Sequence, residues 1–443
     1  MDLLSPKVKP YPWGTRDAIA ELQGRPVPAP GPEAELWMGA HPSAPAGVAW
    51  TTLDEVIAAA PERALGAEYA ARFGGRLPFL LKVLSAGQAL SIQVHPSREQ
   101  AQQGYAAENA RGLPPGVPGR NYVDDWPKPE LLYALTPFEV AAGLRTPADA
   151  AALLAALAVP ELEPLAAGLA DAVGEEVLAT ALASVLEWPV AGRAGLVTAV
   201  VAACQRLASS GGPYADACAA VVRVADDHPG DLGVVALLLM RHEILPPGRA
   251  VFMPAGGLHA YLRGTGIELL ANSDNVVRSG LTGKHIDVPE LLKLLDPSVS
   301  VPVIAPRVLA DGITWFDTPA PEFRLYVIDL PGPAPDGSAP PGPAPDGFVP
   351  VGYTSAAASS GPALALPGVG PRIVLCLDGA CTLSAAPGPV LDLTRGESCF
   401  IPFADGPVSA SGPARLILAT AGPAPGPAPG PAPGPAPGPG PGP

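Results

Sequence analysis

The chain is poor in cysteine, and the few cysteines present do not form a disulfide framework. Its 443 residues include only five, at Cys204, Cys218, Cys376, Cys381 and Cys399. No two of them form a C-x-x-C pair, and an odd number cannot be fully paired within the chain. We therefore expect free thiols and a reducing compartment.

Positive charge is also scarce. The chain has 27 Lys and Arg against 42 Asp and Glu, a formal net charge of −15. Such a charge repels nucleic acid and anionic membrane surfaces at long range, so neither is an expected partner. An anionic substrate would need a local cluster of basic side chains inside a pocket.

Long apolar runs are absent. The longest, residues 194–204, is shorter than the roughly 18 uncharged residues that a bilayer crossing needs. The first ten residues contain two prolines and two lysines where a signal peptide would be continuously apolar. We expect no membrane segment, no secretory signal and a cytoplasmic location.

A chain of this length is expected to form more than one core. Residues 77–94 (LPFLLKVLSAGQALSIQV) have the apolar density of two buried strands joined at Ala86-Gly87. Ser97 and Gln100 then form a capping-box pattern at the start of a helix. Strand character returns from Pro246 and again at residues 323–330 (FRLYVIDL).

The region 146–245 differs in character from what surrounds it. Thr146, Pro147 and Asp149 are typical of a helix N-cap, an N1 proline and a first-turn acid. Segments 161–186, 194–208, 213–226 and 230–241 keep the spacing of amphipathic helices. The strands before and after this region both carry residues of the metal-site motifs described below. We therefore interpret the region as a helical insertion with a packing role.

Proline and glycine concentrate in two segments. Two copies of PGPAPDG, at 331–337 and 341–347, predict a flexible surface loop. Residues 423–443 contain only Pro, Ala and Gly, which cannot bury enough surface to fold, so we expect a disordered polyproline-like tail.

Two related motifs point to a metal site. The first is Gly87-x5-Gln93-x-His95 and the second is Gly248-x5-Pro254-x-Gly256-x-x-His259, and both are half-motifs of cupin barrels. In a strand, residues two apart share a face, so Gln93 and His95 can point to one ion. His259 would approach that ion from a neighbouring strand.

A fourth ligand is expected to be an acid, and Glu130 is the best candidate because it directly precedes an apolar strand-like run. Two nitrogen and two oxygen donors favour zinc, although such a set also tolerates iron or manganese. His41, His228 and His242 lack a comparable context, so we expect ordinary structural or surface histidines there.

With these residues in place, the chain resembles the type I mannose-6-phosphate isomerases, also called phosphomannose isomerases. The resemblance is carried by YPWG at 11–14, ELWMGAHPSAP at 35–45, LPFLLKVLSAGQALSIQVHP at 77–96, KPE at 128–130, PAGGLHAYL at 254–262 and DNVVRSGLTGKHID at 274–287. It implies one zinc ion per chain held by Gln93, His95, Glu130 and His259. It also implies a small sugar phosphate as substrate, and we expect a monomer.

The fold implied is mainly β with an α insertion: double cupin-type β-barrels (jelly roll) plus an inserted α-helical domain. We place the metal-binding catalytic cupin domain at 1–145 and 246–315, the helical insertion at 146–245, and a C-terminal cupin at 316–422. That last domain repeats Gly396-x5-Pro402 but has Pro407 where His259 would fall, so we expect a degenerate barrel without metal.

The implied reaction interconverts mannose 6-phosphate and fructose 6-phosphate through an enediol, in mannose catabolism or GDP-mannose supply. It needs a base and positive charge beside two sugar oxygens. Candidate catalytic residues are Arg278, Glu268, Lys128, Asp274 and Tyr261, with Glu268 favoured as base. Candidate substrate-binding residues are Ser91, Lys284, Arg98, Trp13 and Glu35. We expect Lys284, Arg98 and Lys128, together with Arg278, to form the cation cluster that binds the phosphate.

One segment departs from the family pattern. Where the family often reads Y-x-D-x-N-H-K-P-E, this chain has Trp126 and Pro127 in place of the Asn-His pair. Two alternative functions stay open: a cupin oxygenase holding redox-active iron, and a non-catalytic sugar-binding or storage-type double cupin. Gln93 weighs against the first, because such oxygenases usually have a His-x-His pair there.

Overall fold

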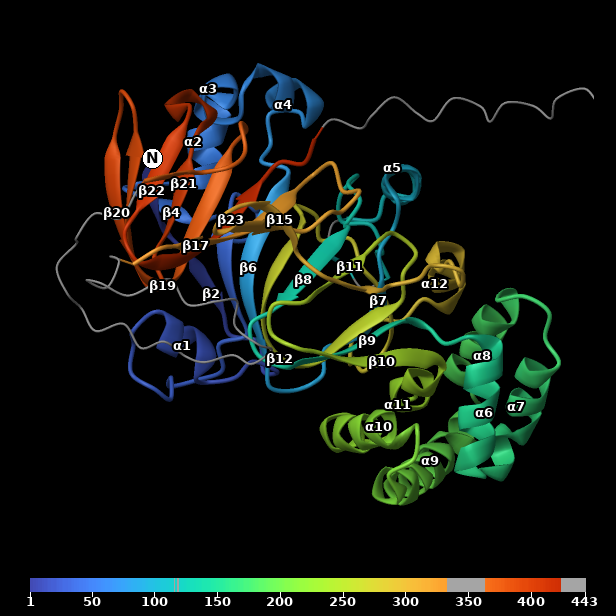
Figure 1. The fold of residues 1–443 in the computed structure, drawn as a ribbon. Helices are drawn as coiled ribbons and strands as arrows, with labels where there is room; N and C mark the ends of the chain where they lie inside the picture. The colour runs from blue at the N-terminus through green and yellow to red at the C-terminus, as the bar shows by residue number, and fades with distance from the viewer. Residues whose placement is uncertain (115, 118, 333–362, 424–443) are drawn as a thin grey trace, which may run out of the picture.

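A computed structural model describes all residues except 115, 118, 333–362 and 424–443. The proline-rich loop expected from the sequence lies outside the described residues from residue 333 onward. The expected tail lies outside them from residue 424 onward. The described chain forms two antiparallel sheets and a block of helices (Figure 1).

The first sheet carries the motif residues, and a single long strand, β12 (His259–Ala271), joins its two halves. The first half of β12 pairs with β7 and β9, and the second half pairs with β6 and β8. The other bounds are β2 (Lys7–Lys9), β3 (Glu35–Gly39), β6 (Phe79–Ala86), β7 (Ile92–Val94), β8 (Glu130–Ala134), β9 (Phe138–Leu144), β10 (Met240–Leu245), β11 (Ala250–Met253), β13 (Val277–Gly280) and β14 (Val303–Ile304).

The second sheet contains the C-terminal strands together with the N-terminal strand β1 (Asp2–Ser5), which pairs with β21. Its long strand β19 (Arg372–Ala385) pairs with β21 and β23 at one end and with β20 and β22 at the other. The remaining bounds are β4 (Gly47–Val48), β5 (Thr51–Thr52), β15 (Arg307–Ala310), β16 (Ile313–Trp315), β17 (Arg324–Leu330), β18 (Leu364–Ala365), β20 (Val390–Thr394), β21 (Ser398–Ile401), β22 (Val408–Ser411) and β23 (Ala414–Thr420).

The two sheets share one hydrophobic core. On β6, Leu81 and Val83 pack into a cluster that also contains Leu325 of β17 and Ile417 of β23. The alternate residues of β6 face the other side, where Leu84 joins a separate cluster inside the first barrel. Because both faces are covered, β6 is buried along its whole length, and Lys82 is its one charged residue.

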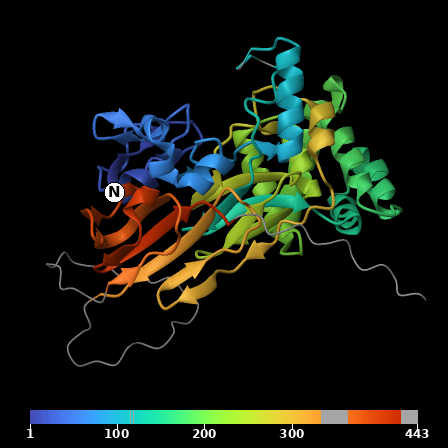
Figure 2. The same cartoon turned by 90° about the horizontal axis from the view of Figure 1, so that it is seen from above.

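The helical block lies against β9 and β10, away from the second sheet (Figures 1 and 2). Thr146 caps α6 as predicted, with its hydroxyl accepting from the Asp149 amide. The segment 230–241 is only partly helical, because the chain has turned into β10 by Met240 to pair with β9. Bounds are α6 (Pro147–Leu157), η1 (Pro160–Leu162), α7 (Glu163–Ala170), α8 (Glu176–Leu186), α9 (Val190–Ser210), α10 (Ala215–Asp227), α11 (Gly233–Ala236) and η2 (Leu237–Leu239).

One described helix, α9, is long and apolar enough to cross a membrane, with 21 residues and a mean hydropathy of 1.2. A core helix passes the same test. Leu196, Val200 and Cys204 of α9 pack into the core of the helical block.

The expected helix after Ser97 is present as α5 (Arg98–Ala110), which projects from the barrel in Figure 2. Its capping box is complete, since Ser97 accepts from the Gln100 amide and Gln100 accepts from the Ser97 amide. The other helices are α1 (Ala18–Leu22), α2 (Leu53–Ala59), α3 (Pro61–Leu65), α4 (Ala67–Arg72), α12 (Val288–Leu294) and η3 (Phe403–Asp405).

Candidate metal centre

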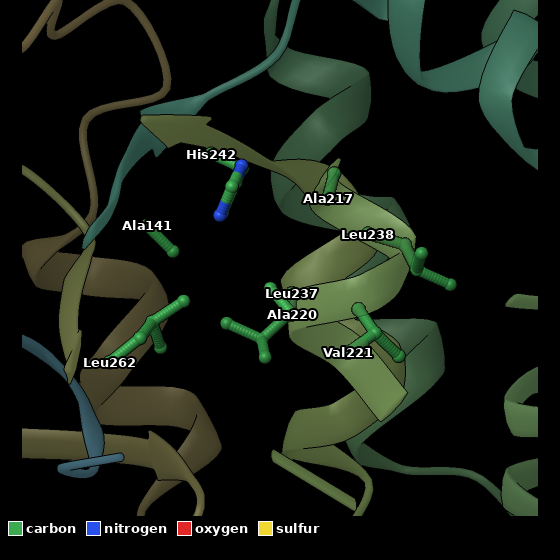
Figure 3. A pocket seen from close by; sticks show the side chains of 8 residues that line it. All are labelled: Ala141, Ala217, Ala220, Val221, Leu237, Leu238, His242 and Leu262. Atoms are coloured by element: carbon green, nitrogen blue, oxygen red, sulfur yellow. The ribbon is translucent and has the colours of Figure 1, made fainter. Parts of the chain in front are cut away.

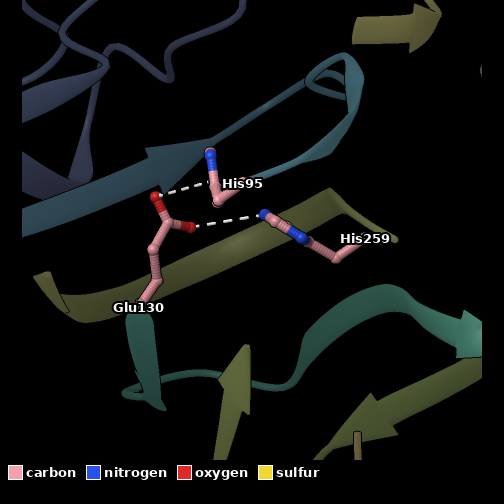
Figure 4. A group of neighbouring side chains, drawn as sticks. All are labelled: His95, Glu130 and His259. Atoms are coloured by element: carbon pink, nitrogen blue, oxygen red, sulfur yellow. Dashed lines mark ion pairs between the residues drawn. The ribbon is translucent and has the colours of Figure 1, made fainter. Parts of the chain in front are cut away.

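Three of the four predicted metal ligands meet inside the first barrel (Figure 4). His95 lies just beyond β7, Glu130 begins β8 and His259 begins β12. The Nε2 atoms of both histidines are 3.3 Å from the Glu130 carboxylate, one from each oxygen. All three side chains are buried, so bulk water does not reach the ligand atoms of the cluster.

The two imidazoles are held in the tautomer that a metal requires. Nδ1 of His95 is 2.8 Å from the carbonyl oxygen of Asn275, and Nδ1 of His259 is 3.0 Å from that of Gly257. A carbonyl only accepts hydrogen bonds, so each Nδ1 carries the proton and each Nε2 offers a lone pair. Neither Nε2 has a hydrogen-bond partner among the described residues, although both are buried. These atoms fit a divalent cation.

The charges of the cluster also suit a cation. Burial, and then the nearby Lys128 ammonium, lower the pKa of His95 to about 4, so the imidazole is neutral. Burial alone would raise the pKa of Glu130, but Lys128 and the two histidines outweigh it and hold that pKa well below its usual range. The site therefore presents the neutral His95 nitrogen and one carboxylate, with Nε2 of His259 facing the other carboxylate oxygen.

The fourth predicted ligand, Gln93, lies in the middle of β7. Its strand register sets it opposite His259 of β12 on one side and opposite Arg278 of β13 on the other. Residues paired in this way point to the same face of a sheet. Gln93 and Arg278 therefore share the face of the cluster, and ligation by Gln93 stays a prediction.

A row of charged side chains continues from the cluster along the sheet. Lys82 of β6 lies directly opposite Glu268 of β12, and its Nζ is 2.8 Å from the Glu268 carboxylate and 3.4 Å from that of Glu35. Burial would lower the pKa of Lys82, but Glu268 and Glu35 raise it, so the ammonium stays charged. Burial raises the pKa of Glu268.

Lys82 is a site residue that the sequence reasoning missed. It is the one charged side chain in the apolar run FLLKVLSA, and its partner in register on β3, Trp37, has its ring 4.9 Å from the Lys82 ammonium. An isolated charge in a strand buried on both faces could have been read as a functional residue.

Lys128 and Tyr261 lie beside the metal cluster. The Lys128 ammonium is 2.9 Å from the Glu130 carboxylate, and the Tyr261 hydroxyl donates to the other oxygen of Glu130 at 3.4 Å. Burial, and then Glu268 and Glu130, raise the pKa of Tyr261 well above its ordinary value. Tyr261 is thus a neutral donor between the two carboxylates.

Asp274 approaches from the loop after β12. Burial opposes its ionisation, yet His41, Lys128 and Lys82 together lower its pKa. Nε2 of His41 is 3.4 Å from the Asp274 carboxylate, and Nδ1 of His41 contacts the Ser43 hydroxyl at 2.9 Å. His41, expected to be an ordinary residue, therefore lies at the edge of the site.

The predicted phosphate-binding cations fall in two places. Arg278 and Lys284 lie close enough that Arg278 lowers the pKa of Lys284, and neither forms an ion pair within 4.0 Å among the described residues. Arg98 instead donates to the buried Glu322 carboxylate at 2.6 Å. Its guanidinium lies 5.7 Å from the Trp126 ring, so its predicted phosphate contact competes with an ion pair.

The remaining predicted residues lie around this region. Glu35 is buried and accepts from the Trp37 indole at 2.7 Å. Trp13 is half-buried and stacks on Tyr11, with ring centroids 5.7 Å apart. Ser91 precedes β7 and is half-buried. Contacts of these three residues with a substrate stay predictions.

A small internal space lies between the barrel and the helical block (Figure 3). It has a volume of about 10 Å³, close to the least that holds one water molecule, and its lining is apolar except for His242. His242 is 2.7 Å from Glu139, while His228 is 3.1 Å from the Ala89 carbonyl oxygen. This space cannot hold a sugar phosphate, and both histidines have structural contacts, as expected.

The fold and the site define a metal-binding double cupin. Its features are two paired barrels, helices inserted between strands and a buried His-Glu-His cluster. Solved structures agree with this class. A lysine-to-alanine variant of phosphomannose isomerase from Salmonella typhimurium aligns with a TM-score of 0.82 at 32% identity, covering 95% of this chain and 99% of that one. A mannose 6-phosphate isomerase bound with zinc and yttrium aligns with a TM-score of 0.79 at 32% identity. The predicted fold class is confirmed.

Sequence comparisons give the family. The model of the type I phosphomannose isomerase catalytic domain matches residues 1–147. The mannose-6-phosphate isomerase of Salmonella typhimurium is 34% identical over 424 residues, covering 94% of this chain and 98% of that protein. The enzyme of Rattus norvegicus is 35% identical over 323 residues, covering 68% and 73%. The chain belongs to the type I mannose-6-phosphate isomerase family, which confirms the assignment made from its motifs.

Proposed function

We propose that this chain interconverts mannose 6-phosphate and fructose 6-phosphate with one zinc ion held by Gln93, His95, Glu130 and His259. The observation that carries the proposal is the buried pair of Nε2 atoms that face one carboxylate and have no hydrogen-bond partner among the described residues. Zinc takes imidazole nitrogen and carboxylate oxygen as ligands, and here it would act as a Lewis acid toward sugar oxygens.

The proton transfer of the isomerisation needs a base near neutral pH. Glu268 is the favoured candidate because burial raises its pKa. The Lys82 ammonium, 2.8 Å from that carboxylate, fixes its orientation. Asp274 is the second candidate, but its pKa is lowered by its neighbours.

Charge that develops on the sugar oxygens of an enediol needs positive groups and hydrogen-bond donors. Lys128 and Tyr261 both contact Glu130, so their donor groups lie beside the metal cluster. Arg278 shares its sheet face through the register with Gln93. We assign these three residues to stabilisation of that charge.

The phosphate group is expected at Arg278 and Lys284, because these neighbouring cations repel each other and lack an ion pair within the described residues. An anion placed between them would relieve their mutual repulsion. Ser91 would donate a hydroxyl hydrogen bond to the phosphate. Arg98 would bind the phosphate only after breaking its ion pair with Glu322. Trp13 and Glu35 would shape the substrate site.

Further features of the proposal follow from the sequence. The division into a catalytic barrel at 1–145 and 246–315, a helical insertion at 146–245 and a metal-free barrel at 316–422 stays a prediction. We propose a cytoplasmic monomer that serves mannose catabolism or GDP-mannose supply. Light scattering of the purified chain tests the monomer directly.

The proposal is tested by a coupled assay that detects fructose 6-phosphate formed from mannose 6-phosphate, with and without a chelator. We expect turnover that the chelator abolishes and that added zinc restores. Turnover unaffected by complete metal removal would contradict the role of zinc.

The same preparation discriminates the alternatives. An oxygenase-type double cupin would consume oxygen, and a non-catalytic one would bind the sugar phosphate without converting it. The buried charges Lys82 and Glu268, together with the half-buried Lys128 beside Glu130, favour a catalytic site over a simple binding site.

A further inference from the structure

Three polar side chains outside the metal cluster join the two loops that border it. Asp124 belongs to the loop between α5 and β8, and Ser273 and Asn275 belong to the loop between β12 and β13. We call these three residues the loop network. Ser273 is 2% exposed and Asn275 is 0% exposed, so their polar atoms depend on each other rather than on water.

Asn275 uses its whole side-chain amide to hold the neighbouring loop. Its Oδ1 accepts from the backbone amides of Val123 at 2.7 Å and Asp124 at 3.2 Å. Its Nδ2 donates to the backbone carbonyls of Asp124 and Trp126, both at 2.8 Å. A side-chain amide has two N–H donors and one oxygen that can accept two hydrogen bonds, so every hydrogen-bonding position of Asn275 is used.

Asp124 holds the second loop in return. Its Oδ1 accepts from the Ser273 hydroxyl at 2.8 Å and from the Trp126 amide at 2.9 Å. Its Oδ2 accepts from the backbone amide of Asp274 at 2.9 Å. All of these partners are donors, so both side-chain oxygens of Asp124 act as acceptors in the network.

The network ends at two groups of the site. The backbone carbonyl of Asn275 accepts from Nδ1 of His95 at 2.8 Å, and the backbone of Asp274, fixed by Asp124, carries the carboxylate that faces His41. We propose that Asn275 and Asp124 are positioning residues that hold His95 in its metal-binding tautomer and hold Asp274 at the pocket as one unit.

This inference rests on the proposed zinc site, and it predicts a cost in metal affinity. Removing the Asn275 side chain leaves its carbonyl in the chain but frees the loop that aims it. Partners that orient a metal-binding histidine typically contribute about 10- to 100-fold in metal affinity. We therefore expect Asn275→Ala to bind zinc about 10- to 100-fold more weakly than the unmodified chain.

The affinity is measured on the full chain by competition with a fluorescent zinc chelator. Asn272→Ala is the matched control, because Asn272 lies in the same loop and donates to the Leu77 carbonyl oxygen at 3.3 Å, away from His95. We expect Asn272→Ala to keep the zinc affinity of the unmodified chain.

A second readout separates positioning from general destabilisation. Cobalt(II) in place of zinc gives a visible spectrum that reports the ligand geometry. Asn275→Ala should change this spectrum, whereas Asn272→Ala should not, even if both lower the melting temperature. If Asn275→Ala does not fold, Ser273→Ala removes one bond to Asp124 and should show a smaller loss of affinity in the same direction.

The outcomes are distinct. Equal zinc affinity and equal cobalt spectra for Asn275→Ala and the unmodified chain would overturn the positioning role, and so would a normal Ser273→Ala if the first variant does not fold. An unmodified chain that binds no zinc would instead refute the proposed function on which the inference rests.

Discussion

At the scale of single residues, the site depends on buried and half-buried charges that lie next to opposite charges. Lys82 is 2.8 Å from Glu268, and Lys128 is 2.9 Å from Glu130. An ion taken out of water is tolerated only when it is paired, so each of these side chains restricts the state of its neighbour. The result is a pocket whose acids differ in pKa although all lie within one barrel.

Glu268→Gln tests the proposed base. The amide keeps the shape of the side chain but cannot accept a proton, so turnover should fall by about 100-fold or more. Zinc content should not change, because Glu268 is not among the three clustered ligands. The measurements are the coupled isomerase assay and metal analysis of the same sample.

Asp274→Asn is the companion variant, since Asp274 is the second candidate for the base. Near-normal turnover in Glu268→Gln together with a large loss in Asp274→Asn would transfer the role to Asp274. A loss of zinc from Glu268→Gln would show that the substitution acts through the metal instead.

At the scale of elements, the helical block is joined to the barrel by a small ionic cluster. Glu139 of β9 accepts from Arg223 of α10 at 2.6 Å and lies 2.7 Å from Nε2 of His242 on β10. Burial would raise the pKa of Glu139, but hydrogen bonds from His242 and Arg223 outweigh it and lower the pKa. The contact between α10 and the sheet is therefore sensitive to acid.

This lowered pKa gives a prediction of stability against pH. A carboxyl group with a depressed pKa stabilises the folded state above its unfolded pKa of about 4.3, and that contribution is lost as the pH falls through the folded value. Glu139→Gln should therefore lower the free energy of unfolding near neutral pH. The difference from the unmodified chain should shrink as the pH falls below about 4.

Urea unfolding followed by circular dichroism across this pH range measures the effect. Glu243→Gln is the control, since Glu243 is 37% exposed and pairs with Arg241 at 3.1 Å on the surface. A pH dependence that is the same in Glu139→Gln and Glu243→Gln would contradict the prediction.

At the scale of the whole molecule, the two sheets are held together by one shared core and the metal cluster draws three strands together. Leu81 of the first sheet and Ile417 of the second belong to the same hydrophobic cluster. His95, Glu130 and His259 follow or begin β7, β8 and β12. A bound ion would therefore stabilise the folded chain as well as support turnover.

Metal removal tests this link. A ligand that binds only the folded state stabilises it by about 2.7 kcal/mol at a free concentration 100 times its dissociation constant. Calorimetry should show a melting temperature that rises with free zinc. His259→Ala should remove the rise, and a rise that survives this substitution would place the stabilising zinc elsewhere.

The sequence by itself determined the ligands that cluster and the class of fold. His95 and His259 could be picked out because glycines at fixed spacing mark the turns of each half-motif, and such turns depend on local backbone geometry. The helix caps at Ser97 and Thr146 were predictable for the same reason, since the residues that form a cap are close in sequence.

Only the tertiary structure decided which charges share the pocket. Lys82 and Glu268 are 186 residues apart in sequence, and His95 and Asn275 are 180 apart. Nothing in the local pattern around Lys82 indicates that β6 lies beside β12, because strand pairing depends on long-range burial of apolar faces. The ion pairs, the tautomers of the two histidines and the bonds between the loops are consequences of that pairing.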